Sequence, residues 1–250
     1  MKKHIALFST TLLFASFLGG ARAFADENGN NTPDPATAET KVTGELQLSE
    51  DGGYNPNPPS GDLNSKTGIS SSYFGIAYAP NTFDIGSDVK LADTNEEQNI
   101  VMEGQTASGD NKQSFHVAVK DKYREDNRGW VLKAKLANPI DQADLGIKIK
   151  TSTKENSVKR NMNDGNAAFE STDLIDQVKK AGEEIEVTNN ANLEITTVDT
   201  DVMKAKKGKF VNGAYDLELP EVKLYIPDAS KVEAQTLQTQ VVWTLTNAAQ

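Results

Sequence analysis

The chain has 250 residues, 26 basic and 36 acidic side chains, a net charge of −10 and 37% hydrophobic residues. This length is enough for one domain with a buried core, and the negative charge argues against binding to nucleic acid or to an anionic bilayer. The absence of cysteine excludes disulfides, thiolate nucleophiles and sulfur-ligated zinc. Because the chain also has only two histidines, we expect no metal site, no cofactor and no catalytic residues.

Residues 1–25 have the pattern of a secretory signal peptide. Two lysines precede an apolar run over 5–18, and small residues follow up to Ala25. The run is shorter than the roughly 20 apolar residues that a transmembrane helix needs. We therefore expect cleavage after Ala25, an exported protein and no transmembrane segment after cleavage. Cleavage removes three basic residues, one histidine and no acid, so the mature chain has a net charge of −13 and one histidine, His116.

The segment after the expected cleavage point is polar. Residues 26–40 are rich in Asn, Asp, Pro and Thr, a composition that predicts a disordered leader. Residues 42–48 alternate apolar or small residues with polar ones, which predicts a first strand. The Pro and Gly residues between 49 and 72 predict a long loop that covers a surface.

Strand patterns dominate the remainder of the chain. Only residues 171–181 predict a helix, with a short apolar stripe and a stop at Gly182. The pattern predicts an all-β fold, an antiparallel β-sandwich or barrel-like domain over 41–250 with one short helix. Residues of high β propensity at period two predict strands at 73–79, 99–102, 114–120, 130–136, 145–150, 185–187, 193–198, 222–226 and 236–246.

The two tryptophans lie in strands that share the spacing Trp-x-Leu. Trp130 and Leu132 fall on one face of the first strand, and Trp243 and Leu245 fall on one face of the last. An indole beside a leucine is typical of a hydrophobic core. We expect these four residues mainly in the core, with direct stacking of the indole rings on a ligand as the alternative.

These two strands, the second close to the C-terminus of a secreted chain without cysteine, resemble the WxL-domain surface proteins of low-GC Gram-positive bacteria. Four further features follow in the family's order: a proline-rich loop at 56–59, a strand at 73–80 that resembles the family's first one, a Phe-Asp-Ile-Gly turn at 83–86 and an Asp-Lys-Tyr-Arg stretch at 121–124. The family usually has Phe-Gly where this chain has Ile85 and a glycine, a difference that affects local packing. The resemblance covers residues 41–250 and indicates a short, stand-alone WxL form.

The resemblance implies non-covalent attachment to the cell wall, with peptidoglycan as the proposed ligand and no catalysis. It also implies partners, namely membrane-anchored envelope proteins that interact with WxL modules. No cysteine follows Ala25 and no sorting motif precedes Gln250, which agrees with non-covalent attachment. We expect a secreted protein on the surface of a Gram-positive bacterium. Indirect attachment through such a partner and a wall- or polysaccharide-degrading enzyme are the alternatives.

Polar side chains near the tryptophan strands form the candidate binding surface. Lys133 alternates with the apolar face of its strand, and Gln240 and Thr244 do the same in the last strand. Their amine, amide and hydroxyl groups suit a glycan or a protein partner. Asp121 and Arg124 precede the first tryptophan strand, where they either brace a loop or recognise a polar partner through the planar guanidinium.

Other polar residues have simpler interpretations. His116 lies opposite the apolar face of strand 114–120, which predicts an exposed position, and it has no second imidazole with which to bind a metal. The acidic residues occur in polar loops, where solvated surface charge is the expectation. The lysines between 204 and 209 are expected to be solvated, with contact to an anionic wall polymer as the alternative.

Overall fold

The computed structural model describes residues 33, 35–47, 54–69, 73–106, 112–123, 125, 127–141, 144–178 and 187–247. The chain divides into two units, 1–47 and 48–250. In the first unit, residues 35–47 are exposed and form no strand, so the strand predicted at 42–48 is wrong over 42–47. Alternation alone does not make a strand, because the backbone N–H and C=O groups need a neighbouring strand as partner. The predicted signal peptide lies outside the described residues.

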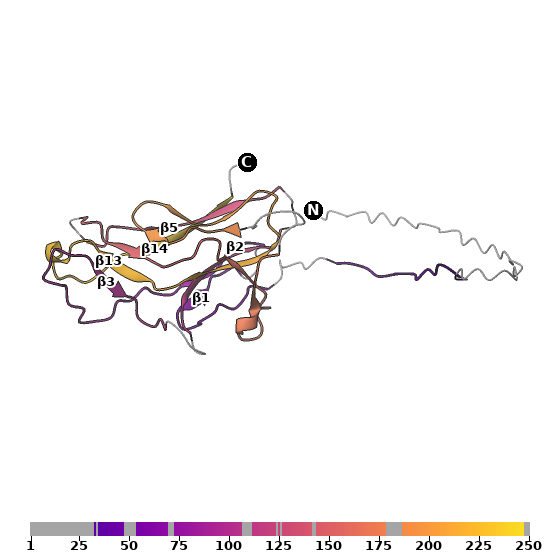
Figure 1. The fold of residues 1–250 in the computed structure, drawn as a ribbon, viewed down its shortest axis with the longest axis horizontal. Helices are drawn as coiled ribbons and strands as arrows, with labels where there is room; N and C mark the ends of the chain where they lie inside the picture. The colour runs from indigo at the N-terminus through magenta and orange to yellow at the C-terminus, as the bar shows by residue number, and fades with distance from the viewer. Residues whose placement is uncertain are drawn as a thin grey trace, which may run out of the picture. The chain divides into compact units, whose positions relative to one another are not determined.

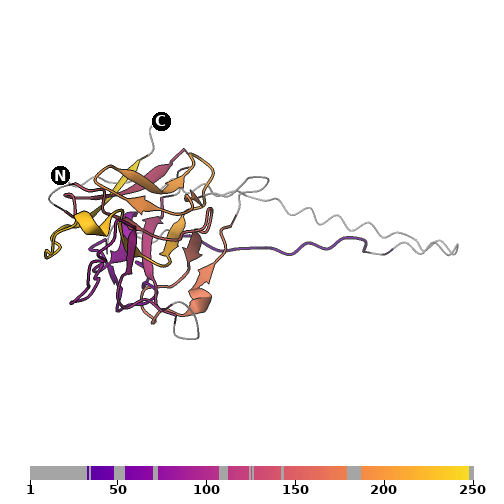
Figure 2. The ribbon, with the colours of Figure 1, turned by 60° about the vertical axis from the view of Figure 1, so that its left-hand side comes forward.

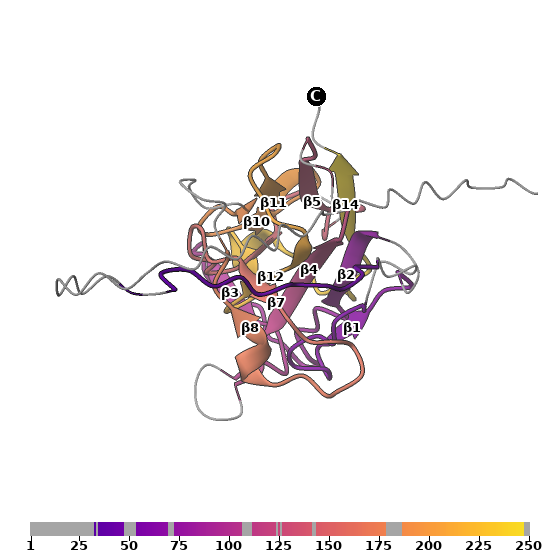
Figure 3. The same ribbon diagram turned by 90° about the vertical axis from the view of Figure 1, so that its right-hand side faces the viewer.

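The second unit contains a six-stranded antiparallel sheet, whose labelled strands lie side by side in Figure 3. Its central strand β4 is buried on both faces. The strand order is β1 (Asn64–Lys66), β2 (Phe74–Pro80), β4 (Phe115–Asp121), β12 (Gly213–Leu219), β7 (Lys159–Asn161) and β8 (Leu174–Ile175).

Two four-stranded sheets complete this unit, and Figures 1 and 2 show them from two directions. The first has the order β10 (Glu194–Ile195), β6 (Lys148–Lys150), β13 (Lys223–Ile226) and β3 (Gln98–Val101). The second has the order β14 (Val241–Asn247), β5 (Trp130–Leu136), β11 (Thr200–Ala205) and β9 (Val187–Thr188). The described helical segments are the 3-10 turns η1 (Ser171–Asp173) and η2 (Ala229–Lys231). The predicted all-β fold is confirmed.

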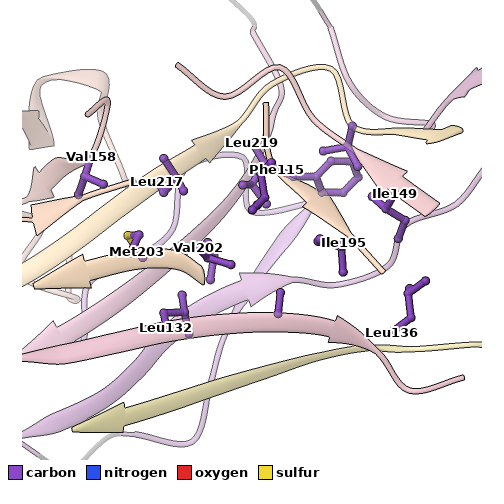
Figure 4. Packing of buried hydrophobic residues seen from close by; sticks show 14 of the residues in the cluster. Phe115, Leu132, Leu136, Ile149, Val158, Ile195, Val202, Met203, Leu217 and Leu219 are labelled. Carbon is purple, nitrogen blue, oxygen red and sulfur yellow. The ribbon is translucent and has the colours of Figure 1, made fainter. Parts of the chain in front are cut away.

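One hydrophobic cluster fills the space between the sheets. Figure 4 shows Leu217 and Phe115 of the six-stranded sheet opposite Leu132 and Leu136 of β5. Ile149 of β6 joins them, so all three sheets contribute to the same core. Antiparallel sheets that bury their inner faces against each other in this way form a β-sandwich.

The helix predicted over 171–181 is wrong where the structure describes it. After the 3-10 turn η1, Leu174–Ile175 pairs with β7 as strand β8. The side chains of Ile175 and Val178, which were to form the buried stripe, are 38% and 47% exposed. A helix here would bury no continuous apolar face, and helices gain most of their stability from such burial.

The strand predictions succeed best where the alternation is complete. β5 has the predicted bounds. By contrast, the strand predicted at 236–246 begins only at Val241, as β14. Before Val241, the backbone N–H of Asn138 bonds the Thr239 hydroxyl at 3.3 Å instead of a backbone carbonyl. No strand was predicted at β1, which lies in the predicted loop 49–72, or at β7, β11 and β12. Alternating Tyr215, Leu217 and Leu219 was the signal available for β12.

Candidate functional site

The first Trp-x-Leu motif lies in the core. Trp130 and Leu132 are both fully buried. The indole of Trp130 packs edge-on against Phe210 and at a tilt against Tyr215, with ring centroids 6.2 and 6.0 Å away. Such aromatic contacts stabilise a core beyond their buried area, and no ligand can reach this ring in the folded protein.

The second Trp-x-Leu motif has a different environment. Trp243 and Leu245 lie on β14 opposite Ala134 and Leu132 of β5, and both side chains are half-buried. Trp243 packs against the core and also lines a surface groove of about 980 Å³. One motif therefore anchors the sandwich, and the other also borders the surface.

The groove lies between the loop at 80–89 and the segment 235–243, which includes the start of β14. Met102, Ile149 and Leu224 supply apolar lining from the core. Asp84 and Asp88 line it as well, and no lysine, arginine or histidine is among the lining residues. The groove therefore favours a neutral or cationic occupant over an anionic one.

Two of the expected surface residues are brought together. Lys133 and Thr244 are directly opposite each other on β5 and β14, and Asp201 of β11 lies opposite Lys133 on its other side. The Lys133 Nζ is 3.8 Å from the Asp201 Oδ1. A hydroxyl, an ammonium and a carboxylate thus form a row across three strands on the outer face of this sheet.

Gln240 extends the same face. It is exposed and immediately precedes β14, where its backbone carbonyl accepts a 2.8 Å hydrogen bond from Ala137. Gln240 and Thr244 are four residues apart in an extended segment, so their side chains point to the same, outer side of the sheet. Lys133, Gln240 and Thr244 form what we call the outer-face triplet.

Asp121 does not belong to this surface, which corrects its placement on the candidate binding surface. The side chain is fully buried, and the Oδ2 lies 3.4 Å from the Nη2 of Arg128. The Oδ1 accepts a 3.1 Å hydrogen bond from the backbone N–H of Tyr123. Asp121 therefore braces the turn before β5, and its partner is Arg128. Arg124 lies outside the described residues.

Arg128 was not predicted as a site residue. One of its partners, Phe74, is distant in the sequence, and its contacts with Tyr123 and Asp121 depend on how the turn folds. Its guanidinium lies 4.3 Å from the ring centroid of Tyr123 and 4.9 Å from that of Phe74. Cations held against aromatic faces in this way gain electrostatic stabilisation. The arrangement fixes the loop that leads into the first tryptophan strand.

Burial raises the pKa of the Asp121 carboxyl, against the opposing effect of the Arg128 guanidinium. The folded protein therefore holds this proton more tightly than the unfolded chain, whose carboxyl titrates near 3.8. As pH rises from 3.8 through the raised pKa, this carboxyl lowers the free energy of unfolding. We expect Asp121→Asn to gain stability relative to the parent protein over that window. Urea unfolding of both proteins from pH 4 to 7 measures their free energies of unfolding. If the advantage of Asp121→Asn over the parent protein decreased as the pH rose, the raised pKa of Asp121 would be contradicted.

His116 is buried, not exposed as predicted. Its Nδ1 is 3.0 Å from both carboxylate oxygens of Asp216, and its Nε2 is 2.9 Å from the Ser114 Oγ. Asn64 covers it, since the Asn64 Oδ1 accepts from the His116 backbone N–H at 2.8 Å and the Nδ2 donates to the Ser114 carbonyl at 3.0 Å. Asn64 is the first residue of β1, and the alternation within β4 does not reveal that this side chain covers His116.

The order Ser114, His116, Asp216 is also that of a hydrolase triad. Ser114 is only 6% exposed, and the groove is lined by none of the three residues. The carboxylate of Asp216 also accepts a 2.7 Å hydrogen bond from Tyr78, which in turn accepts one of 2.9 Å from Asn161. The geometry is that of a buried polar network that holds β2, β4, β7 and β12 together.

The described part of the chain contains neither a metal-binding cluster nor a membrane-spanning helix. No group of three or more His, Cys, Asp or Glu side chains there is placed to hold a metal ion. None of the helices described is long and apolar enough to cross a bilayer.

Comparison with known proteins gives one match. The profile of a family described as WxL domain surface cell wall-binding matches residues 30–248, which is nearly the whole chain. No curated protein and no solved structure matches the chain.

Proposed function

Because this chain belongs to the WxL family of surface domains that bind the cell wall, we propose that its wall ligand is peptidoglycan and that its outer-face triplet makes the contact. We further propose that residues 1–25 direct export and are removed, that 26–40 form a leader, and that the mature protein is held non-covalently at the wall of a Gram-positive bacterium. The family description concerns binding, which supports a binding role over a catalytic one.

The observation that carries the proposal is the row of polar groups across β11, β5 and β14. Lys133 and Thr244 lie on strands that pair without a register shift, and Asp201 pairs with Lys133 next to a register shift in β11. All three positions are therefore held by strand pairing and not by loops. Hydroxyl, ammonium, amide and carboxylate groups together offer the donors and acceptors that a sugar polymer needs. A repeating polymer also permits several molecules or faces to bind at once, which raises the apparent affinity.

The proposal is tested by pelleting the mature protein with purified wall sacculi from which protein has been stripped. We expect the parent protein to pellet and a variant with Lys133→Ala, Gln240→Ala and Thr244→Ala to stay in solution. All three side chains are at least partly exposed, so the variant should keep its circular dichroism spectrum and its unfolding midpoint. Lys154→Ala, which also removes one exposed lysine, serves as the control and should pellet like the parent.

Three results would contradict the proposal. Retained pelleting by the triple variant would exclude the outer-face triplet as the contact. Pelleting of the parent protein only after a membrane-anchored envelope protein is added would mean that attachment is indirect. Release of reducing sugars from the sacculi would point instead to a degrading enzyme.

A further inference from the structure

Among the described strands, β14 lies at the edge of its sheet and is paired on one side only. It pairs with β5 alone, and the carbonyl of Gln240 accepts from Ala137 on that side. In an antiparallel pair, alternate residues direct their backbone groups toward the partner and away from it. Val241, Trp243 and Leu245 therefore present N–H and C=O groups to the open side. Among the described residues, no backbone hydrogen bond reaches them there.

This edge also lacks the usual protection against pairing. Exposed edge strands are normally short or carry charges, proline or a bulge. Residues 241–247 contain no charged residue and no proline, and their seven pairs with β5 run without a register shift. The other edge strands, β1, β3, β8, β9 and β10, have only two to four residues.

The groove provides room beside the open edge. The side chains of Val241 and Trp243 line it on one side, and the loop at 80–89 lines it on the other. The alternate side chains of a strand added to β14 would enter this groove. Because Asp84 and Asp88 line the groove without a basic residue, a strand whose groove-facing side chains carry no negative charge fits it.

Residues 41–47 meet this condition. Val42 and Leu46 alternate with Lys41, Thr43, Glu45 and Gln47, so the apolar side chains share one face and both charged side chains lie on the other. Val42 is 92% exposed and Leu46 fully exposed, although both suit a buried strand face. The segment is seven residues long, which equals the length of β14, and it forms no strand of its own.

We propose that residues 41–47 of one copy add as a strand to the open edge of β14 in a second copy. Backbone hydrogen bonds to Val241, Trp243 and Leu245 would then extend the sheet, and Val42 and Leu46 would bury their side chains in the groove. Because the two surfaces differ, the contact is heterologous and joins copies into closed rings or open chains. The proposal goes beyond wall binding, since the contact uses the backbone edge of β14 and the groove, of whose lining residues only Gln240 belongs to the outer-face triplet.

The first test measures the mass of the full mature protein by light scattering over a range of concentrations. We expect concentration-dependent association that is lost in Leu46→Asp. Gln47→Asp is the matched control, because it adds the same charge one residue away on the polar side of the segment, and it should still associate. A parent protein that is monomeric at every concentration, or equal association of both variants, would overturn the proposal.

The second test locates the contact. It also distinguishes pairing of β14 with residues 41–47 of another molecule from pairing with the same residues of its own chain. The protein has no cysteine, so Thr43→Cys and Thr244→Cys can be made in separate molecules and mixed under mild oxidation. Both side chains lie on the outer side of the expected strand pair, and we expect a disulfide-linked dimer of the two variants. Thr43→Cys mixed with Glu155→Cys is the control and should give none.

Hydrogen exchange of the parent protein and of Leu46→Asp measures whether the backbone amides at the edge of β14 are protected. We expect the amides of Trp243 and Leu245 to exchange more slowly in the associated protein than in Leu46→Asp. Protection of these amides in a monomer would mean that each chain fills its own edge, and it would overturn exchange between copies. Unprotected amides in an associated protein would place the contact elsewhere and would also overturn the proposal.

Discussion

Trp130→Ala is expected to lower the free energy of unfolding by about 3–5 kcal/mol, the usual cost of truncating a buried aromatic side chain. The indole is fully buried and contacts Phe210 and Tyr215, so the cavity would lie between packed rings that cannot collapse freely. Urea unfolding followed by far-UV circular dichroism measures the loss without relying on tryptophan fluorescence.

Trp243→Ala is the matched comparison, because it removes the same side chain from the same Trp-x-Leu spacing. Its ring is half-buried on an edge strand, so the expected loss is clearly smaller than at Trp130. The Trp130 Nε1 has no hydrogen-bond partner among the described residues, and Trp130→Phe should therefore recover much of the lost stability. Equal losses for the two alanine variants would contradict the distinct roles of the two motifs.

Asp216→Ala is expected to lower the free energy of unfolding by about 2–5 kcal/mol, because it leaves buried donors without an acceptor. The carboxylate is 2% exposed and faces both His116 and the Tyr78 hydroxyl. Burial and this carboxylate raise the pKa of Tyr78, so the phenol stays protonated and continues to donate. Removing the carboxylate should lower the Tyr78 pKa, which ultraviolet titration of the phenolate detects.

Asp201→Ala is the control for that loss. Asp201 is also a strand aspartate with a cationic partner, but its side chain is 48% exposed and lies 3.8 Å from the Lys133 Nζ. Exposed ion pairs contribute about 0–1 kcal/mol, so this variant should unfold almost like the parent protein. A loss at Asp216 no larger than at Asp201 would show that the buried network is not a stabilising element.

The faces of individual strands were predictable because side chains alternate strictly in a strand. β5 has the bounds and the buried face that its Trp-Val-Leu-Lys-Ala-Lys-Leu pattern predicts. The same reasoning failed at His116, since alternation places it opposite Val117 but does not show that Asn64 covers it. It failed at 42–47 for a related reason, because the pattern of a strand does not supply a neighbour.

The site could be predicted only in part. The outer positions of Lys133 and Thr244 followed from the sequence, and the β5–β14 register then placed them opposite each other. The groove beside Trp243 could not be predicted, because the loop at 80–89 and the segment 235–243 that line it are far apart in the chain. The sequence left open whether Asp121 braces a loop or recognises a partner, and its buried contact with Arg128 agrees with bracing.

By itself, the sequence determined the all-β class, the family and the residues that share a face with each tryptophan, because these follow from local alternation and motif spacing. Only the tertiary structure decided that Trp130 lies at the centre of the sandwich while Trp243 borders a groove on an open edge. The physical reason is that alternation fixes the direction of a side chain relative to its own strand. What packs on that face, and whether the strand ends its sheet, depends on segments distant in the chain.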